Sequence, residues 1–171
     1  MYMEMIRKIN KLIRKVSALE KKMIQGLQDQ NLQGQDFSRW DLERTNLKKS
    51  NLENANFTDA VLVEADLSEC YGRLAIFERA NLQKANLKNA ICHEWDFTDA
   101  DLRGASLRNA NLTNAMMIDA DLRGADLRGA NLKGVEIHSG FFNNLADTIV
   151  NRFTRLPDGL TEEQYQGLIW K

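Results

Sequence analysis

The chain has 171 residues, which is enough for a single domain with appended segments. Its 23 basic and 24 acidic residues nearly cancel, so bulk charge excludes a general nucleic-acid binder and a strong polyanion. The two cysteines are too few for a disulfide scaffold and no stretch resembles a membrane span or a signal peptide, so we expect a cytoplasmic protein without stable membrane insertion.

Residues 1–29 are predicted to form an amphipathic, basic α-helix. Apolar residues recur along it at heptad a and d positions, and the opposite face is rich in lysine and arginine. Three roles stay open: a cap on the following repeat, a contact with a second copy or a partner protein, and a surface lying on an anionic membrane. The apolar face carries no Trp or Phe, which argues against the membrane role. Its a and d positions are Tyr2, Met5, Ile9, Leu12, Val16, Leu19 and Met23.

Residues 30–139 form a five-residue repeat. From Leu32 a large apolar residue stands at every fifth position, and 18 of the 22 slots between residues 32 and 137 hold Leu or Phe. Alanine usually stands two residues before this slot, and Asn or Asp stands between them. Ala-Asn-Leu therefore reads inward, outward, inward, as in a short strand, and the two residues that follow suit a turn.

Short strands joined by regular corners predict a polygonal coil, an all-β solenoid with parallel strands. The number of sides follows from phenylalanine, which recurs every 20 residues, or every four units, at Phe37, Phe57, Phe77 and Phe97. We expect these four rings to stack in one core column, with successive coils about 4.8 Å apart. The repeat would then make about five coils and a rod roughly 26 Å tall. The Asn/Asp residues are expected to satisfy backbone groups near the corners.

The pattern A(D/N)LXX resembles that of the pentapeptide-repeat proteins, over about residues 31–139. The resemblance implies their fold, a right-handed quadrilateral parallel β-helix. It also implies a non-enzymatic role in protein interaction, as in the cyanobacterial members that regulate cell differentiation by binding other proteins. The alternative is a DNA mimic, because some members protect DNA gyrase by imitating a duplex with strongly acidic, dimeric surfaces. Here the repeat is only mildly acidic and its late units carry arginines, so the first role is favoured: a bacterial, cyanobacterial-type regulator with an unidentified protein partner.

The repeat is interrupted at residues 69–77, "ECYGRLAIF". Gly72 and Cys92 replace core leucines in successive coils, while Tyr71 and Ile91 replace the outward Asn one above the other. An apolar cluster on a polar rod is typical of a protein-contact site. The candidate contact residues are Tyr71, Arg73, Leu74, Ile76, Ile91 and His93.

Local repacking of the core is the competing explanation of the same interruption. Glycine in a leucine slot would leave a void that costs about 2–5 kcal/mol unless it is filled. Leu74 or Tyr71 could swing inward through a bulge, and Trp95, in a slot normally held by alanine, could fill the space left by Cys92. The sequence leaves open whether residues 69–77 bulge or keep the register, and the two explanations can coexist.

Residues 140–171 are predicted to form a helical C-terminal cap. Phe141, Phe142, Leu145, Ile149 and Phe153 fall on one face of an amphipathic helix that would plug the last coil. A Pro-Asp-Gly turn follows, and Thr161 with Gln164 forms a capping box for a last short helix. The apolar residues after it either pack on the rod or make a dimer contact, so a homodimer through the terminal helices is possible.

No arrangement of residues predicts an enzyme, a cofactor or a metal. Cys70 and Cys92 point inward and His93 points outward, so they do not converge on a metal, and no Cys-x-x-Cys spacing exists. In the late units a basic residue often follows the core leucine, and we expect its charge to be paired largely with nearby aspartates. These residues are Arg103, Arg108, Arg123, Arg128 and Lys133.

Overall fold

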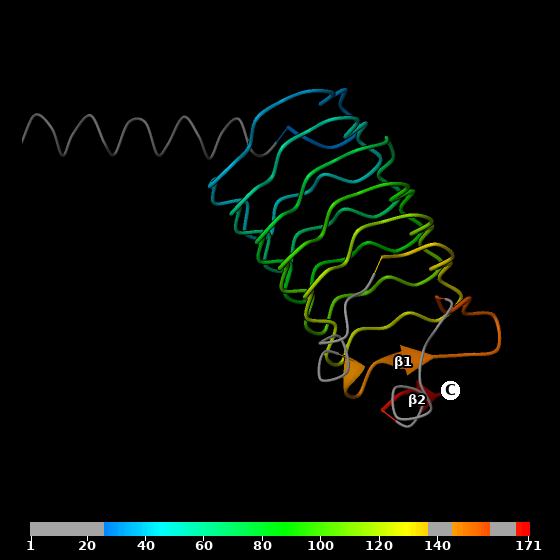
Figure 1. Cartoon of the computed structure of the whole chain (residues 1–171). Coiled ribbons are helices and arrows are strands. Elements are labelled where there is room, and N and C mark those ends of the chain that lie inside the picture. Colours follow the sequence, from blue (N-terminus) through cyan, green and yellow to red (C-terminus); the bar gives the residue numbers. More distant parts are fainter. Residues whose placement is uncertain (1–25, 137–144, 158–166) are drawn as a thin grey trace, which may run out of the picture.

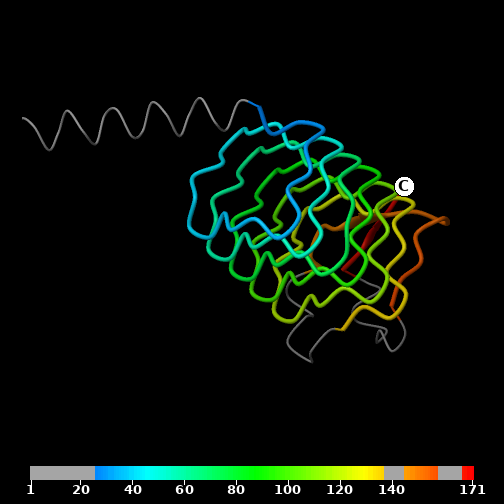
Figure 2. The same cartoon turned by 90° about the horizontal axis from the view of Figure 1, so that it is seen from above.

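A computed structural model describes residues 26–136, 145–157 and 167–171, and shows a rod of stacked coils (Figure 1). Each coil takes 20 residues, because parallel bridges join outward residues 20 apart from Asn31↔Asn51 to Met116↔Glu136. Viewed from above, the coils lie over one another along the rod (Figure 2). The period of four units per coil is therefore confirmed.

The hydrogen bonds of a single unit explain why a five-residue repeat makes a corner. In the unit around Leu52, the Ala55 N–H donates to the Leu52 carbonyl at 2.9 Å and closes a β-turn. Asn54, the third residue of this turn, has φ 55°, the left-handed conformation that type II turns require at this position. The Leu52 and Asn54 N–H groups donate to the carbonyls of Tyr71 and Arg73 in the next coil, at 2.7 and 2.9 Å. One side and one corner thus attach each unit to its neighbour along the rod.

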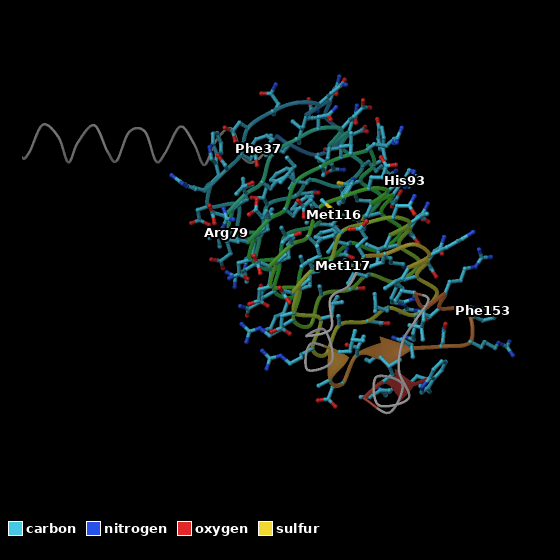
Figure 3. All side chains as sticks on the ribbon, viewed as in Figure 1. Phe37, Arg79, His93, Met116, Met117 and Phe153 are labelled. Carbon is cyan, nitrogen blue, oxygen red and sulfur yellow. The ribbon has the colours of Figure 1, made fainter. Side chains whose placement is uncertain are left out.

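The core is a set of inward columns. Most core leucines and the alanines beside them are fully buried. The phenylalanines stack as expected, with ring centroids 5.0 Å apart between Phe37 and Phe57, 4.7 Å between Phe57 and Phe77, and 5.4 Å between Phe77 and Phe97. Their rings are within 18° of parallel. Met117 is the next residue of this column and is fully buried, and it lies below Phe37 in the view of Figure 3.

The Asn/Asp column satisfies the backbone at the corners, as predicted. The Asn56 Oδ1 atom accepts from the Thr58 N–H at 3.0 Å, and the Asp96 Oδ1 atom accepts from the Thr98 N–H at 2.9 Å. The same bond recurs in the other units whose outward residue is Asn or Asp. These residues therefore hold the corner before the left-handed residue that turns the chain.

The coil begins inside the segment predicted as the N-terminal helix. Leu27 packs against the core, and the Asp29 N–H donates to the Lys48 carbonyl at 2.8 Å. Asp29 also has the left-handed φ of a corner, 57°. Residues 27–29 are thus a pentapeptide corner, and the helix could not extend to residue 29. The rest of that prediction, residues 1–25, lies outside the described residues.

The helical C-terminal cap is wrong for the residues that the structure describes. Residues 145–157 add part of a further coil instead: strand β1 (Ile149–Val150) stacks on the repeat through Asp126↔Ile149, and strand β2 (Ile169–Trp170) pairs in parallel with β1. Leu145 and Val150 are buried five residues apart, whereas Phe153 is 64% exposed. The spacing of Leu145, Ile149 and Phe153 suggested a helix, but the inward residues follow the five-residue period. Phe141, Phe142, Thr161 and Gln164 lie outside the described residues.

Candidate functional site

The interruption keeps the register. Tyr71 pairs with Asn51 and Ile76 pairs with Asn56, each 20 residues apart, so residues 69–77 form no bulge. Leu74 and Tyr71 remain outside, 50% and 46% exposed, so neither swings inward. The irregular sequence therefore changes one corner without shifting the coil.

Trp95 compensates for the missing leucine. Its indole is fully buried, with its centroid 5.1 Å from that of Phe77, and its Nε1–H donates to the Gly72 carbonyl at 2.8 Å. Filling such a space avoids the cost of a cavity, and the buried indole N–H obtains the acceptor it needs. Gly72 is required here, because it has φ 121° and a Cβ atom would lie 2.3 Å from the Glu53 nitrogen.

The indole disrupts the backbone of this corner. In the other described five-residue units, the carbonyl of the core residue accepts a hydrogen bond from the N–H three residues later, which closes the turn. At this corner the Gly72 carbonyl accepts from the Trp95 indole instead, and the Ala75 N–H makes no bond to it. The Gly72 and Leu74 N–H groups also make no bond to the next coil, where the carbonyls of Ile91 and His93 would be their acceptors. Among the described units only this one lacks all three bonds. We call residues 71–75 with 91–95 the open corner.

Apolar side chains surround the open corner. Tyr71 and Ile91 project from adjacent coils of one side of the rod, Leu74 lies on the corner, and Ile76 begins the next side. Ile91 is 50% exposed and Ile76 is 37% exposed. The predicted residues therefore occupy one side of the rod, the corner that follows it and the start of the next side, and we call this set the contact surface: Tyr71, Arg73, Leu74, Ile76, Ile91 and His93.

Two polar residues of the contact surface are held in place. The Arg73 Nη2 atom donates to the Glu94 Oε2 atom at 2.6 Å. The His93 Nδ1 atom lies 2.8 Å from the Thr113 carbonyl oxygen, so it carries the proton and the Nε2 atom faces away from that bond, 3.6 Å from Glu94. His93 and Arg79 lie at opposite edges of the rod in the view of Figure 3, with Met116 between them. The polar rim of the contact surface is therefore ordered by its own contacts.

Apolar outward residues cannot accept the hydrogen bond that an Asn or Asp side chain accepts from the N–H two residues later. Tyr71, Ile76 and Ile91 have no acceptor for the N–H two residues later, and Val61 and Met116 share this loss elsewhere on the rod. A hydrogen bond of this kind contributes about 0.5–1.5 kcal/mol. Three such losses at neighbouring corners, with apolar surface exposed to water, have no benefit for folding that we can identify.

Metal-binding clusters and reactive thiols are absent from the described residues. No group of three or more His, Cys, Asp or Glu side chains is arranged to hold a metal ion in the described ranges. Burial raises the pKa of Cys70 to about 12 and also raises that of Cys92, so both thiols stay protonated and unreactive at neutral pH. The Cys70 Sγ–H donates to the Leu47 carbonyl at 2.9 Å, which makes it part of the core.

The arginines of the late units are largely paired, as expected. Arg103, Arg123 and Arg128 each contact the aspartate two residues before them at 2.5–2.6 Å. The hydrogen bond from Arg123 lowers the pKa of Asp121 despite the opposing effect of burial, and Arg128 does the same for Asp126. On both sides of the rod that carry these arginines, positive and negative side chains therefore alternate instead of forming a surface of one sign.

Aromatic residues gather at the C-terminal end, which sequence reasoning missed. Phe153 and Trp170 are 64% and 54% exposed, and the Arg152 guanidinium lies 4.7 Å from the centre of the Phe153 ring. Together with Asn151 and Lys171 they line a shallow depression of about 390 Å³. Phe153 points away from the rod (Figure 3), whereas the sequence was interpreted as burying it. The described residues contain no helix with the length and hydropathy needed to cross a bilayer.

Comparison with known proteins identifies the family. The model of pentapeptide repeats matches residues 27–62, 55–91 and 96–134, with eight copies. The chain belongs to the pentapeptide-repeat family. Members are right-handed quadrilateral β-helices that generally serve as structural or interaction modules, and the 20-residue coil agrees with four sides.

Several solved pentapeptide-repeat structures are similar to the chain. A protein of the Arabidopsis thaliana thylakoid lumen is 29% identical, with 71% of this chain and 81% of that chain covered and a TM-score of 0.37. Rfr23 of the cyanobacterium Cyanothece is 26% identical, with coverages of 84% and 89% and a TM-score of 0.28. QnrB1, a plasmid-mediated fluoroquinolone resistance protein, is 18% identical, with coverages of 80% and 79% and a TM-score of 0.42. Among curated protein sequences none matches the chain.

Proposed function

We propose that this pentapeptide-repeat protein is a non-enzymatic interaction module that binds a protein partner through the contact surface. One observation carries the proposal: Tyr71, Ile76 and Ile91 replace turn-forming Asn or Asp at neighbouring corners and leave apolar side chains exposed. Exposed apolar groups with a polar rim are typical of protein interfaces. The rod is rigid along its length, because each coil is bonded to the next, and it would present this surface with little loss of entropy on binding.

The proposal includes a regulatory role in a bacterial cytoplasm. Two free, buried cysteines support a reducing compartment. A regulator of this kind acts by occupying its partner, so it needs neither a catalytic residue nor a cofactor.

A DNA mimic that binds DNA gyrase is the alternative function. It needs a strongly acidic surface, yet Asp101, Asp121 and Asp126 are each paired with an arginine. A gyrase supercoiling assay with a quinolone inhibitor tests this alternative: protection of supercoiling by the protein would replace the first proposal.

The double variant Tyr71→Asn with Ile91→Asn tests the proposed function. Asn restores the residue type and the corner bond of the neighbouring units, so we expect the fold and the thermal midpoint to be retained or improved. Partner capture from bacterial lysate, measured by quantitative mass spectrometry, should be lost. The control is Met116→Asn, an outward apolar residue away from the contact surface that is 36% exposed, and this variant should capture as the native chain does. Undiminished capture by the double variant would disprove the role of this surface.

A further inference from the structure

The corner that follows strand β1 has one residue more than the corner on which it stacks. Ile149 pairs with Asp126 of the preceding coil. Arg155 pairs with Asn131, so six positions along this segment match five in the preceding coil. An inserted residue redirects side chains at the edge of a sheet. The side chains of this corner therefore leave the regular pattern of the repeat.

The inserted corner is held by its own hydrogen bonds. The Thr154 N–H donates to the Asn151 carbonyl at 2.9 Å, which closes a β-turn. The Asn151 Oδ1 atom accepts from the Phe153 N–H and from the Gly129 N–H of the preceding coil, both at 3.1 Å. Asn is favoured at the first position of such a turn, because its side chain bonds the backbone in this way. The two central residues, Arg152 and Phe153, are thus exposed on an ordered turn.

Two aromatic rings and two cations line the depression beside this corner. Phe153 is 64% exposed and points away from the rod (Figure 3), and Trp170 is 54% exposed. Strand β2 places Trp170 there, because it pairs with β1 at the end of the rod (Figure 1). The Arg152 guanidinium lies 4.7 Å from the centre of the Phe153 ring, a cation–π contact that holds the group without neutralising its charge. Lys171 supplies the second cation, and the lining contains no acidic residue.

Both cations are available to an anionic ligand. None of the ion pairs between described residues involves Arg152 or Lys171. The planar guanidinium offers paired N–H donors that match the two oxygens of a carboxylate. The two rings offer apolar contact beside that charge. The depression therefore suits a carboxylate with an aromatic or aliphatic group next to it.

The number of cations favours a peptide over larger polyanions. Nucleic acids bind by neutralising several phosphates along the strand, and anionic membranes recognise clusters of about four to eight basic residues. Two cations line this depression. Its volume of about 390 Å³ is at the lower end of the range of ligand sites, roughly 300–1,000 Å³, and suits a few side chains of a short segment.

We propose that the C-terminal end of the rod binds a short acidic segment of a partner polypeptide, in which Asp or Glu stands next to an aromatic residue. The carboxylate binds the Arg152 guanidinium and the Lys171 ammonium group, and the aromatic side chain packs against Phe153 and Trp170. This site goes beyond the proposed function and does not depend on it. His93 of the contact surface and Phe153 lie at different heights along the rod in Figure 3.

Peptide selection on the full-length chain tests the site. The probe is a displayed library of random linear 12-residue peptides, and selected peptides should contain Asp or Glu next to Phe, Tyr or Trp. Arg152→Gln should weaken these peptides at least about tenfold, and Phe153→Ser at least about fivefold. Both side chains are exposed, so the variants should melt as the native chain does. The control is Arg39→Gln, a largely exposed arginine near the other end of the rod, which should leave the affinity unchanged.

A double-mutant cycle tests the pairing of charges. Replacing the acidic residue of a selected peptide by its amide should weaken binding as much as Arg152→Gln does. The two changes together should cost no more than either alone, because they remove the same ion pair. Additive losses would overturn the assignment of the carboxylate to Arg152.

The indole N–H resonances locate the bound peptide. Trp170 is exposed in the depression, whereas Trp95 is fully buried and bonded to the Gly72 carbonyl. A selected peptide should shift the Trp170 resonance and leave that of Trp95 in place. The opposite result would place the peptide elsewhere on the rod and overturn the proposal.

Other outcomes separate this site from the contact surface. Peptides that lose binding to Tyr71→Asn with Ile91→Asn, but not to Arg152→Gln, would support the contact surface and overturn this inference. Failure to select acidic peptides would also overturn it. Co-sedimentation with phosphatidylserine vesicles that Phe153→Ser abolishes would assign the depression to a membrane surface instead. A homodimer that Phe153→Ser dissociates would assign it to a second copy, and either result would replace the proposal.

Discussion

At the scale of the residue, the corners impose a conformation that most side chains disfavour. In the part of the chain that the structure describes, the third residue of the turn in each five-residue unit has a positive φ, and in 18 cases it is not glycine. The left-handed conformation lowers the free energy of unfolding by about 1–2 kcal/mol per residue. The cost is smaller for Asn and Asp, whose side chains form hydrogen bonds with nearby backbone groups. Leu74 has φ 60° and no such compensation, which makes it the most poorly suited residue of its column.

Leu74→Asn should therefore stabilise the fold by about 0.5–1 kcal/mol, measured as the free energy of unfolding in urea. Asn54 occupies the same corner one coil earlier with φ 55°, so Asn54→Leu is the reciprocal control and should destabilise by a similar amount. If Leu74→Asn lowered stability, its side chain would contribute to packing and would no longer count as surface kept for contact.

At the scale of the coil, the ring column stabilises the stack. Phe57 is fully buried between Phe37 and Phe77, and its ring is 4° from parallel with that of Phe77. Phe57→Ala should cost about 3–5 kcal/mol in the free energy of unfolding, because it leaves a cavity in the middle of the rod. Phe57→Leu should cost less than half as much, since leucine fills most of the equivalent slots in the other three columns. Equal costs for the two variants would show that the ring–ring contacts, rather than volume, hold the coils together.

The coil was predictable from the sequence because its rule is local and repeated. The five-residue period set the inward column, and Phe37 to Phe97 set the number of sides. The C-terminal coil was mistaken for a helix because "LADTIV" replaces Ala with Thr148 and an outward Asn with Ile149, so the period was hidden while Leu145 and Ile149 matched a helical spacing. The unit after Val150 also has one extra residue, which breaks the count.

The open corner could not be predicted in full for a different reason. Tyr71, Leu74 and Ile91 were visible as departures from the repeat, and the structure leaves them exposed. The missing backbone bonds depend on an indole that reaches Gly72 from 23 residues away, and on its need for an acceptor. The available signal was Trp95 at an alanine position, one coil after Gly72 at a leucine position. The repeat pattern does not specify the direction in which the Trp95 side chain points.

Ion pairs along the late coils predict a loss of stability in acid. Because the Arg123 hydrogen bond lowers the pKa of Asp121, this aspartate stabilises the fold above its unfolded pKa, near 4, and the contribution is lost as pH falls through the lower folded pKa. Asp121→Asn keeps the corner bond and removes the ion pair. We expect it to cost about 0.5 kcal/mol at pH 7, since the pair is partly exposed, and nothing near pH 2. Urea unfolding of both proteins across this range is the measurement, and a difference that grows in acid would contradict it.

At the scale of the whole molecule, the rod behaves as a one-dimensional stack in which each coil contacts only its neighbours. Deleting residues 101–120 removes one full coil and joins Ala100 to Asp121, which stands directly above the position of Asp101. The register is kept, so the shortened chain should fold cooperatively, with a urea m-value reduced in proportion to the surface it no longer buries. Deleting residues 101–119 instead shifts every later side chain by one place and turns core leucines outward. That control should lose cooperative unfolding from the deletion onward. If both deletions unfolded alike, the coils would not be interchangeable, and the stability of the rod would depend on contacts beyond nearest neighbours.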